Sequence, residues 1–228
     1  MGEDKSNRLM RKIDFFMARV YQRIPFTYIW LFRRNFIDFI NSEEKISVLD
    51  AGCGDGSAMQ SLGLSKNIEI TGLDVYEPYL KLAKKKKLYK ELIKMDVRKL
   101  RPQKKYDIVV ASHILEHLSR KEGGEFIKRL EKMANKRVVI ASPVGYFPQD
   151  EYDENIYQIH KSHWTVEDMI DLGYSVSSQG LRILWGNENI VKKYGMLSYF
   201  LFLISIICTP LLLFKPELGT YMICRKDK

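Results

Sequence analysis

The sequence predicts an α/β fold in which helices cover both faces of a mostly parallel sheet. From residue 45 onward, short apolar runs alternate with helical segments, as in parallel sheets that are buried on both faces. Most of these runs end in a polar or small residue. Because such sheets bind ligands beyond the carboxyl ends of their strands, this pattern also predicts a ligand site at one edge.

Each element follows from its own pattern. Strands are expected at 46–51, 68–74, 90–96, 106–112 and 136–142, and helices at 57–64, 78–87, 98–101 and 121–134. Two later strands are expected at 173–179, with or without 181–186, and at 219–226. Thr165 is expected to cap the intervening helix, with Asp168 in the place of the capping glutamate.

Composition sets broad limits on function. The 228 residues are 46% hydrophobic and 29% charged, as in a globular protein. The net charge of +9 suits nucleic acid, anionic lipid or acidic substrates without choosing among them. The three widely spaced cysteines and the charged N-terminus, which lacks the apolar core of a signal peptide, predict a cytoplasmic protein with reduced thiols.

Residues 1–44 are expected to form a separate N-terminal region of amphipathic helices. Ile13, Phe16, Met17 and Val20 follow the spacing of one helix face, and Pro25 separates them from a second aromatic helix. These helices, over 8–41, either pack on the sheet with basic outer faces or act as a substrate lid or membrane-surface contact.

A glycine loop follows the first strand. "VLDAGCGDGS" places Asp50, Gly52, Gly54 and Gly56 in an acid-x-Gly-x-Gly-x-Gly pattern. The dinucleotide fingerprint needs its third glycine one position later, and an acid here would repel a pyrophosphate. The loop therefore favours a ligand that carries positive charge and no phosphate.

Residues 46–142 resemble the class I S-adenosylmethionine-dependent methyltransferases of the type 11-like kind, because four motifs agree in order and spacing. The resemblance implies a Rossmann-like, seven-stranded sheet whose antiparallel last strand lies between the fifth and sixth, and it implies S-adenosyl-L-methionine as cofactor. The implied cofactor-binding residues are Asp50, Ala51, Gly52, Cys53, Gly54, Gly56, Asp74, Val75, Asp96, Val97, Ala111 and His113.

Within that set the resemblance assigns roles to the acids. Asp50 would line the methionine moiety, Asp74 would bind the ribose hydroxyls, and Asp96 with Val97 would bind adenine. The structural alternative is a turn-forming role for Asp50 and helix capping for Asp74 and Asp96.

All four histidines lie in two segments expected at the carboxyl edge of the sheet. His113 and His117 occur in "SHILEHL", and His160 and His163 occur in "YQIHKSHW". Histidine is the commonest general base near neutral pH, so His113, His160 and Tyr157 are the catalytic candidates. A structural role is favoured for His117, and the second pair can alternatively fasten a loop. The spacings predict no metal site.

The segment 143–164 is expected to close the acceptor pocket with Tyr146, Tyr157, His160, His163 and Trp164. It resembles a subset of archaeal and bacterial methyltransferase-domain proteins, although Val144 replaces the usual asparagine. The shared signature residues are Pro143, Gly145, Gln149, Asn155, Gln158, His160, Ser162 and Trp164. This resemblance extends to the reaction class and not to the acceptor.

An uncharged stretch of 20 residues, 195–214, lies within an apolar insertion at 187–216 of the expected 45–228 domain. About 20 apolar residues can span a bilayer, but a single span would strand the last strand on the far side of the membrane. Three interpretations remain open: entry into one leaflet, packing as a helix against the N-terminal helices, or an oligomer interface.

The predicted function is methyl transfer from S-adenosylmethionine to an oxygen, nitrogen or carbon nucleophile of a small or lipid-linked acceptor. Segments 8–41 and 195–214 would contact an anionic membrane surface, with the protein peripheral or monotopic on its cytoplasmic side. The alternatives are an RNA methyltransferase, disfavoured because no RNA-binding module is visible, and a non-catalytic cofactor-binding protein.

Overall fold

The computed structural model describes residues 32–40, 43–151, 153–185, 200–201, 204 and 207–228. Most of the expected N-terminal helices and much of the 195–214 stretch therefore lie outside the described residues, and their predicted roles remain predictions.

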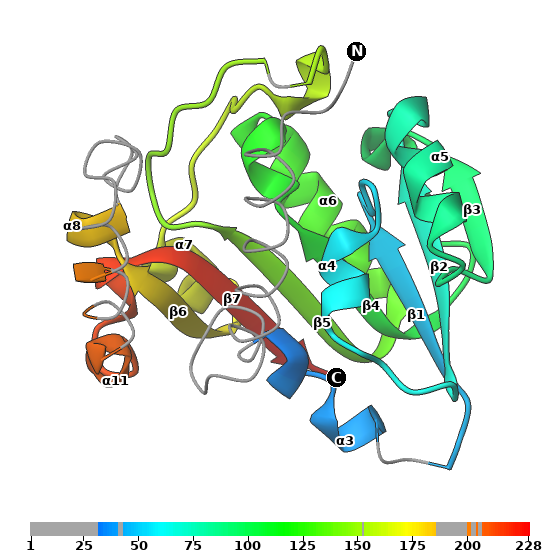
Figure 1. Cartoon of the computed structure of the whole chain (residues 1–228), viewed down its shortest axis with the longest axis horizontal. Coiled ribbons are helices and arrows are strands. Elements are labelled where there is room, and N and C mark those ends of the chain that lie inside the picture. The colour runs from blue at the N-terminus through cyan, green and yellow to red at the C-terminus, as the bar shows by residue number, and fades with distance from the viewer. Residues whose placement is uncertain (1–31, 41–42, 152, 186–199, 202–203, 205–206) are drawn as a thin grey trace, which may run out of the picture.

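Seven strands form one sheet in the order β3-β2-β1-β4-β5-β7-β6 (Figure 1). Their bounds are β1 Ile46–Ala51, β2 Ile68–Asp74, β3 Glu91–Lys94, β4 Tyr106–Ser112, β5 Ala134–Pro143, β6 Ser175–Leu181 and β7 Gly219–Asp227. β7 runs antiparallel between β5 and β6, and the other pairs are parallel. The predicted Rossmann-like sheet and the place of its last strand are confirmed.

The described helices connect these strands. They are α3 Ile37–Ile40, α4 Ser57–Ser61, α5 Glu77–Lys85, α6 Arg120–Met133, α7 Val166–Asp171, α8 Arg182–Trp185 and α11 Thr209–Leu212. Shorter 3₁₀ turns are Val97–Lys99, Leu115–His117, Ile156–Gln158 and Pro216–Leu218. The Thr165–Asp168 capping box forms at the start of α7, as the sequence predicts.

One strand prediction is wrong in part. Residues 182–185 form α8 and do not extend β6, because the last residue of β6, Leu181, already pairs with Gly219, the first residue of β7. Beyond that pair the described part of the chain has no neighbouring strand to offer backbone hydrogen bonds, so an extended conformation gains nothing there.

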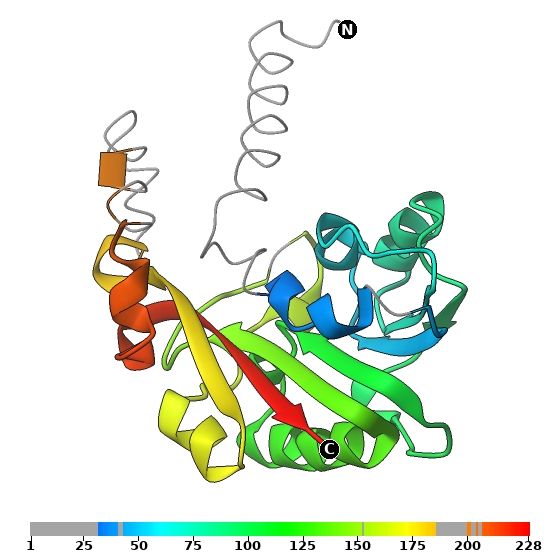
Figure 2. The ribbon, with the colours of Figure 1, turned by 90° about the horizontal axis from the view of Figure 1, so that it is seen from below.

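Both faces of the sheet are covered by buried side chains. On one face Phe126 and Leu130 of α6 pack with Met169 of α7 over β4 and β5. On the other face Phe32 and Phe36 pack near Met59 of α4. Figure 2 shows these layers edge-on, with α3 on one side of the sheet and α6 on the other. Alternate strand residues therefore face two separate cores, which explains why the strands are apolar throughout.

Candidate active site

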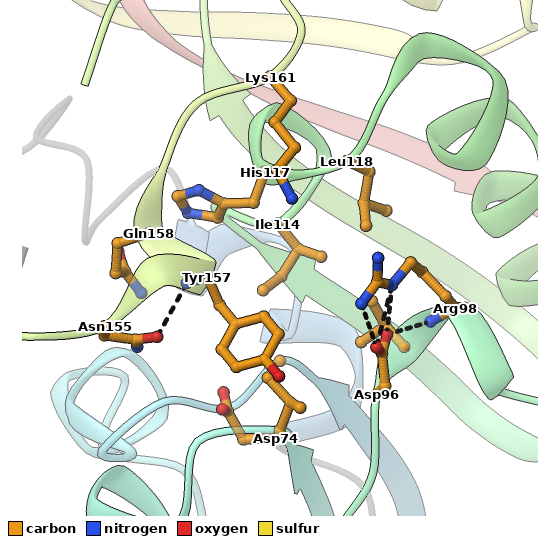
Figure 3. Close-up of a pocket in the computed structure, with 13 residues that line it drawn as sticks. Asp74, Asp96, Arg98, Ile114, His117, Leu118, Asn155, Tyr157, Gln158 and Lys161 are labelled. Atoms are coloured by element: carbon orange, nitrogen blue, oxygen red, sulfur yellow. Dashed lines mark hydrogen bonds and ion pairs between the residues drawn. The ribbon is translucent and has the colours of Figure 1, made fainter. Parts of the chain in front are cut away.

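A pocket opens at the carboxyl edge of the sheet, under the segment 143–164 (Figure 3). The strand ends, the turns after β4 and the overlying segment all contribute to its wall. The lining residues are Gly52, Asp74, Val75, Asp96, Val97, Arg98, Ile114, His117, Leu118, Asn155, Tyr157, Gln158 and Lys161.

The glycine loop turns sharply at the mouth of this cavity. The amides of Gly52 and Cys53 both donate to the Leu73 carbonyl, at 2.8 and 2.9 Å. Gly52 has a φ of +83°, and a Cβ on it would lie 2.0 Å from Cδ1 of Ile114. The site thus needs glycine at position 52, both for the left-handed backbone and for the close approach of Ile114.

Asp74, the last residue of β2, holds the glycine loop while it lines the cavity. Its carboxylate accepts a hydrogen bond from the Gly54 amide at 2.9 Å and one from the Tyr76 amide at 2.8 Å. The side chain is buried, and burial raises the pKa of Asp74 above its ordinary value. This carboxylate would therefore gain from a ligand that donates hydrogen bonds or brings positive charge.

Asp50 lies beneath the loop and does not line the cavity. Its carboxylate accepts a hydrogen bond from the Tyr89 hydroxyl at 2.8 Å. Burial, and to a lesser degree the nearby charge of Asp74, raises the pKa of Asp50 to about 7. A Cβ on Gly56 would lie 2.8 Å from the Tyr89 ring. No sequence pattern predicted that Tyr89 would bond to Asp50.

Asp96 and Arg98 form a charged pair at the far end of the cavity. The Arg98 guanidinium donates to both carboxylate oxygens of Asp96, with its Nε 2.9 and 3.0 Å away, and lowers the pKa of Asp96. Asp96 also accepts from the Arg98 amide at 2.9 Å, which caps the 3₁₀ turn. The capping alternative and a place in the cavity wall thus occur together.

The remaining glycine-loop and strand candidates lie away from the cavity wall. Ala51 and Ala111 are fully buried in the sheet core, and Gly56 faces Tyr89. Cys53 is buried, and burial raises the pKa of its thiol well above the ordinary value, so it stays protonated. Gly52, Val75 and Val97 do line the cavity.

His113 follows β4 in a left-handed conformation, with a φ of +55°. Its Nδ1 lies 3.1 Å from a carboxylate oxygen of Glu116, and the other oxygen accepts from the Ser142 hydroxyl at 3.2 Å. Glu116 is almost fully buried. Burial alone would raise its pKa, but hydrogen bonding and charge from His113 bring the pKa below its ordinary value. A buried carboxylate thus holds the His113 ring in place.

His117 and His160 meet where the segment 143–164 returns to the sheet. Their ring centroids are 4.9 Å apart, and burial lowers the pKa of His117. His117 lines the cavity. The sequence favoured a structural role for His117, and it gave no signal that Glu116, between the two histidines of "SHILEHL", would turn inward.

Within the segment 143–164 the expected acceptor residues separate into two groups. Figure 3 shows the Tyr157 ring pointing toward Asp74, on the side of the cavity that Asp96 also lines. Tyr146 and His163 contact each other on the exposed surface, with ring centroids 6.2 Å apart. Trp164 is buried under the Arg120 guanidinium, 4.0 Å from its ring. These last three do not line the cavity.

The segment is tied down across the cavity mouth. Its tip reaches α5, where the Tyr79 hydroxyl donates to the Asp153 carboxylate at 2.9 Å and the Tyr76 hydroxyl donates to the Asp153 carbonyl at 3.2 Å. Several signature residues hold it internally: Gln149 donates to the Gln158 carbonyl at 3.0 Å, and Asn155 accepts from the Tyr157 amide at 3.0 Å.

The residues present fit S-adenosylmethionine better than a dinucleotide. Two carboxylates, Asp74 and Asp96, line the cavity, and a third, Asp50, lies beneath it. Asp74 already accepts the Gly54 amide, a loop N–H that a phosphate cradle would need. A buried carboxylate such as that of Asp74 stabilises a cationic ligand and would repel a pyrophosphate.

Comparison with known proteins agrees with this chemistry. Residues 48–137 match the family model of the methyltransferase domain. A protein of Invertebrate iridescent virus 6, named "Putative methyltransferase 235L", is 28% identical over 115 residues, which are 50% of this chain and 43% of that protein. The chain therefore matches less than half the length of this relative.

Two solved structures share the fold at low identity. Magnesium protoporphyrin IX methyltransferase from Synechocystis PCC 6803, with bound S-adenosylmethionine, has a TM-score of 0.54 and 16% identity over 100% of this chain and 86% of that one. The small RNA methyltransferase HEN1 has a TM-score of 0.55 and 18% identity over 87% of this chain and 25% of that one. With the glycine loop and its acids, these findings support a class I methyltransferase domain in this chain and S-adenosylmethionine as its cofactor.

Proposed function

We propose that this chain methylates a nucleophilic oxygen, nitrogen or carbon atom of a small or lipid-linked acceptor at a membrane surface. The bound cofactor supplies a methyl group activated by its sulfonium. The protein then has to align the acceptor, exclude water and remove a proton where the acceptor carries one. The observation that carries the proposal is the position of the segment 143–164 across the cofactor cavity.

The segment limits what can reach the cavity. It contributes Asn155, Tyr157, Gln158 and Lys161 to the cavity wall, and its tip is bonded to α5 on the opposite side. A pocket that is bridged in this way suits a small molecule or one end of a lipid better than a large polymer. It supports the small-acceptor proposal over an RNA acceptor, which HEN1 by name methylates.

His113 is the proposed general base. A carboxylate oxygen can only accept a hydrogen bond, so in a neutral His113 ring the contact with Glu116 places the proton on Nδ1 and leaves the lone pair on Nε2. Glu116 thereby fixes the tautomer and the ring orientation, as the acid partner does in other histidine bases. The ring edge also meets Tyr221, with centroids 5.4 Å apart.

The lipid and membrane part of the proposal rests on an apolar surface at the same edge. The start of β7 pairs beside the carboxyl end of β5, at Pro143 and Tyr221, so the β6–β7 connection emerges at the edge that holds the cavity. Among its described residues, the exposed large apolar side chains are Ile183, Phe200, Ile207, Leu211, Leu213, Phe214 and Leu218. Among the described residues, no helix is both long and apolar enough to cross a bilayer.

The acceptor class can be tested with methyl-labelled S-adenosylmethionine and three extracts of cells that express the protein: lipid, aqueous metabolite and total RNA. We expect label in the lipid or the small-molecule fraction. The His113→Ala variant should lose about 10²- to 10⁴-fold of that rate while it still binds the cofactor in calorimetry. Label found in RNA alone would contradict the proposed acceptor.

The membrane part has its own test. We expect the full chain to float with vesicles of anionic phospholipid, and we expect Phe214→Ser combined with Ile207→Ser to reduce the bound fraction several-fold. A double variant outside the β6–β7 connection, Leu82→Ser in α5 with Leu172→Ser after α7, is the matched control, because both side chains are exposed too. Equal flotation of the two double variants would exclude this surface.

A further inference from the structure

We propose that Glu116, His117 and His160 form a binding site for a divalent transition-metal ion, such as Zn²⁺ or Mn²⁺, beside the cofactor cavity. One ligand-type atom from each of the three residues lies within 4.8 Å of the others. A metal ion with bonds of about 2.1 Å holds its ligand atoms roughly 3–4 Å apart. Small side-chain rotations therefore suffice to bring the three groups onto one ion.

The two imidazoles are set up as metal ligands by backbone contacts. Nδ1 of His160 makes a short contact with the Phe147 carbonyl, and Nδ1 of His117 lies 3.4 Å from the Ile159 carbonyl. Carbonyl oxygens accept and never donate, so each Nδ1 carries the proton and each Nε2 keeps its lone pair. An outer hydrogen bond of this kind is the usual support of a metal-bound histidine.

The Glu116 carboxylate is held by neighbouring side chains. Glu116 is 3% exposed and is held by the Ser142 hydroxyl and by His113. Each carboxylate oxygen can accept more than one bond, so these contacts leave lone pairs for an ion. A divalent cation would also offset the cost of burying this negative charge.

Backbone hydrogen bonds join the two segments that supply the ligands. The Glu116 carbonyl accepts from the Lys161 and Ser162 amides at 2.7 and 3.1 Å, and the His160 amide donates to the Gln149 carbonyl at 3.0 Å. The three ligands therefore come from two segments, 43 and 44 residues apart along the chain, that these hydrogen bonds hold together. Such preorganisation separates a built site from a chance cluster of polar side chains.

The position of the site gives the ion a use that rests on the proposed methyl transfer. His117 lines the cavity, so an ion held by it would lie at the cavity wall. Three protein ligands with an open position are typical of catalytic rather than structural zinc. An ion here would bind an acceptor through oxygen, which narrows the acceptor to a hydroxyl or carboxylate compound.

Metal binding can be measured without any acceptor. The full chain, treated with a chelator and then dialysed, is titrated with Co²⁺ while the visible absorption of the bound ion is followed, and Zn²⁺ is then added as competitor. We expect one ion per chain, displaced by Zn²⁺. His160→Gln and His117→Gln should each weaken binding at least about tenfold, whereas His163→Gln, three residues along the same segment and exposed, should not.

Calorimetry with S-adenosylmethionine on each variant shows that it is folded and keeps the two proposals apart. The absence of saturable Co²⁺ or Zn²⁺ binding by the wild type would overturn the metal site. Equal binding by His160→Gln, His117→Gln and wild type would overturn it as well. Metal binding that survives in a protein without methyl transfer would leave the site standing and reject the proposed function alone.

Discussion

The three acids of the cofactor site have different roles, although each lies at or just after the end of a strand. Asp74 faces the cavity and at the same time holds the Gly54 amide. Asp50 is turned away from the cavity and bonded to Tyr89. Asp96 is neutralised by Arg98. Only the environment of each carboxylate, and not its place at a strand end, separates these tasks.

The buried Asp50 should make stability depend on pH. Its pKa is about 7 in the folded protein and about 4 in the unfolded chain. Between these values the folded state keeps a proton that the unfolded state has released, so the free energy of unfolding should fall as pH rises through this window. Asp50→Asn removes the titrating group and should flatten the dependence, by on the order of a few kcal/mol.

Urea denaturation at pH 5 and pH 8 measures this effect. The control variant Asp150→Asn should show the same pH dependence as the wild type, because the Asp150 side chain is exposed. If Asp50→Asn and wild type lose the same stability between the two pH values, Asp50 does not hold a proton in the folded protein.

Gly52 has a left-handed backbone and a close neighbour in Ile114, so a larger residue should be poorly tolerated there. Gly52→Ala would place a methyl group 2.0 Å from Cδ1 of Ile114 and would strain a backbone with a φ of +83°. We expect a loss of about 1–3 kcal/mol of stability and strongly reduced cofactor affinity. Gly63→Ala is a matched control for the backbone strain, because its φ is also positive, at +56°, but no atom lies within 4 Å of the added Cβ. Equal cofactor affinity in the two variants would contradict the role assigned to the loop.

Among the larger elements, the segment 143–164 crosses the cavity and is bonded to α5 at its tip. Its base is fixed by the pairing of Gly145 with Trp164 and its tip by the contact of Asp153 with Tyr79. Segments held mainly by hydrogen bonds open more easily than the core does. Cofactor exchange should therefore depend on the contact at the tip.

Tyr79→Phe removes the hydroxyl that holds Asp153 and leaves the ring in place. One hydrogen bond contributes about 0.5–1.5 kcal/mol, so we expect S-adenosylmethionine to dissociate roughly 2- to 10-fold faster in stopped-flow displacement. Tyr146→Phe removes a hydroxyl from the segment 143–164 itself, away from its tip. The cofactor should dissociate from this variant at the wild-type rate. Identical rates for all three proteins would show that the tip does not control exchange.

At the scale of the whole molecule, local patterns predicted far more than long-range contacts. Apolar runs and turn glycines are local, so the strands could be predicted from them, and the resemblance to class I methyltransferases predicted the place of the last strand. The pairing of Asp50 with Tyr89 and the meeting of Glu116 with His160 join residues about 40 positions apart. No periodicity encodes such pairs, and the turn after Leu181 depended on where the neighbouring strand begins.

Calorimetric titration of the full chain with S-adenosylmethionine tests directly whether the cavity at the carboxyl edge of the sheet binds this cofactor. We expect one site per chain, with affinity reduced at least about tenfold in Asp74→Ala, because the variant loses both a cavity carboxylate and the contact that holds Gly54. The exposed Asp171→Asn should bind as the wild type does. Saturable binding that depends on Asp74 is the result predicted here, and no binding, or equal binding by Asp74→Ala, would contradict it.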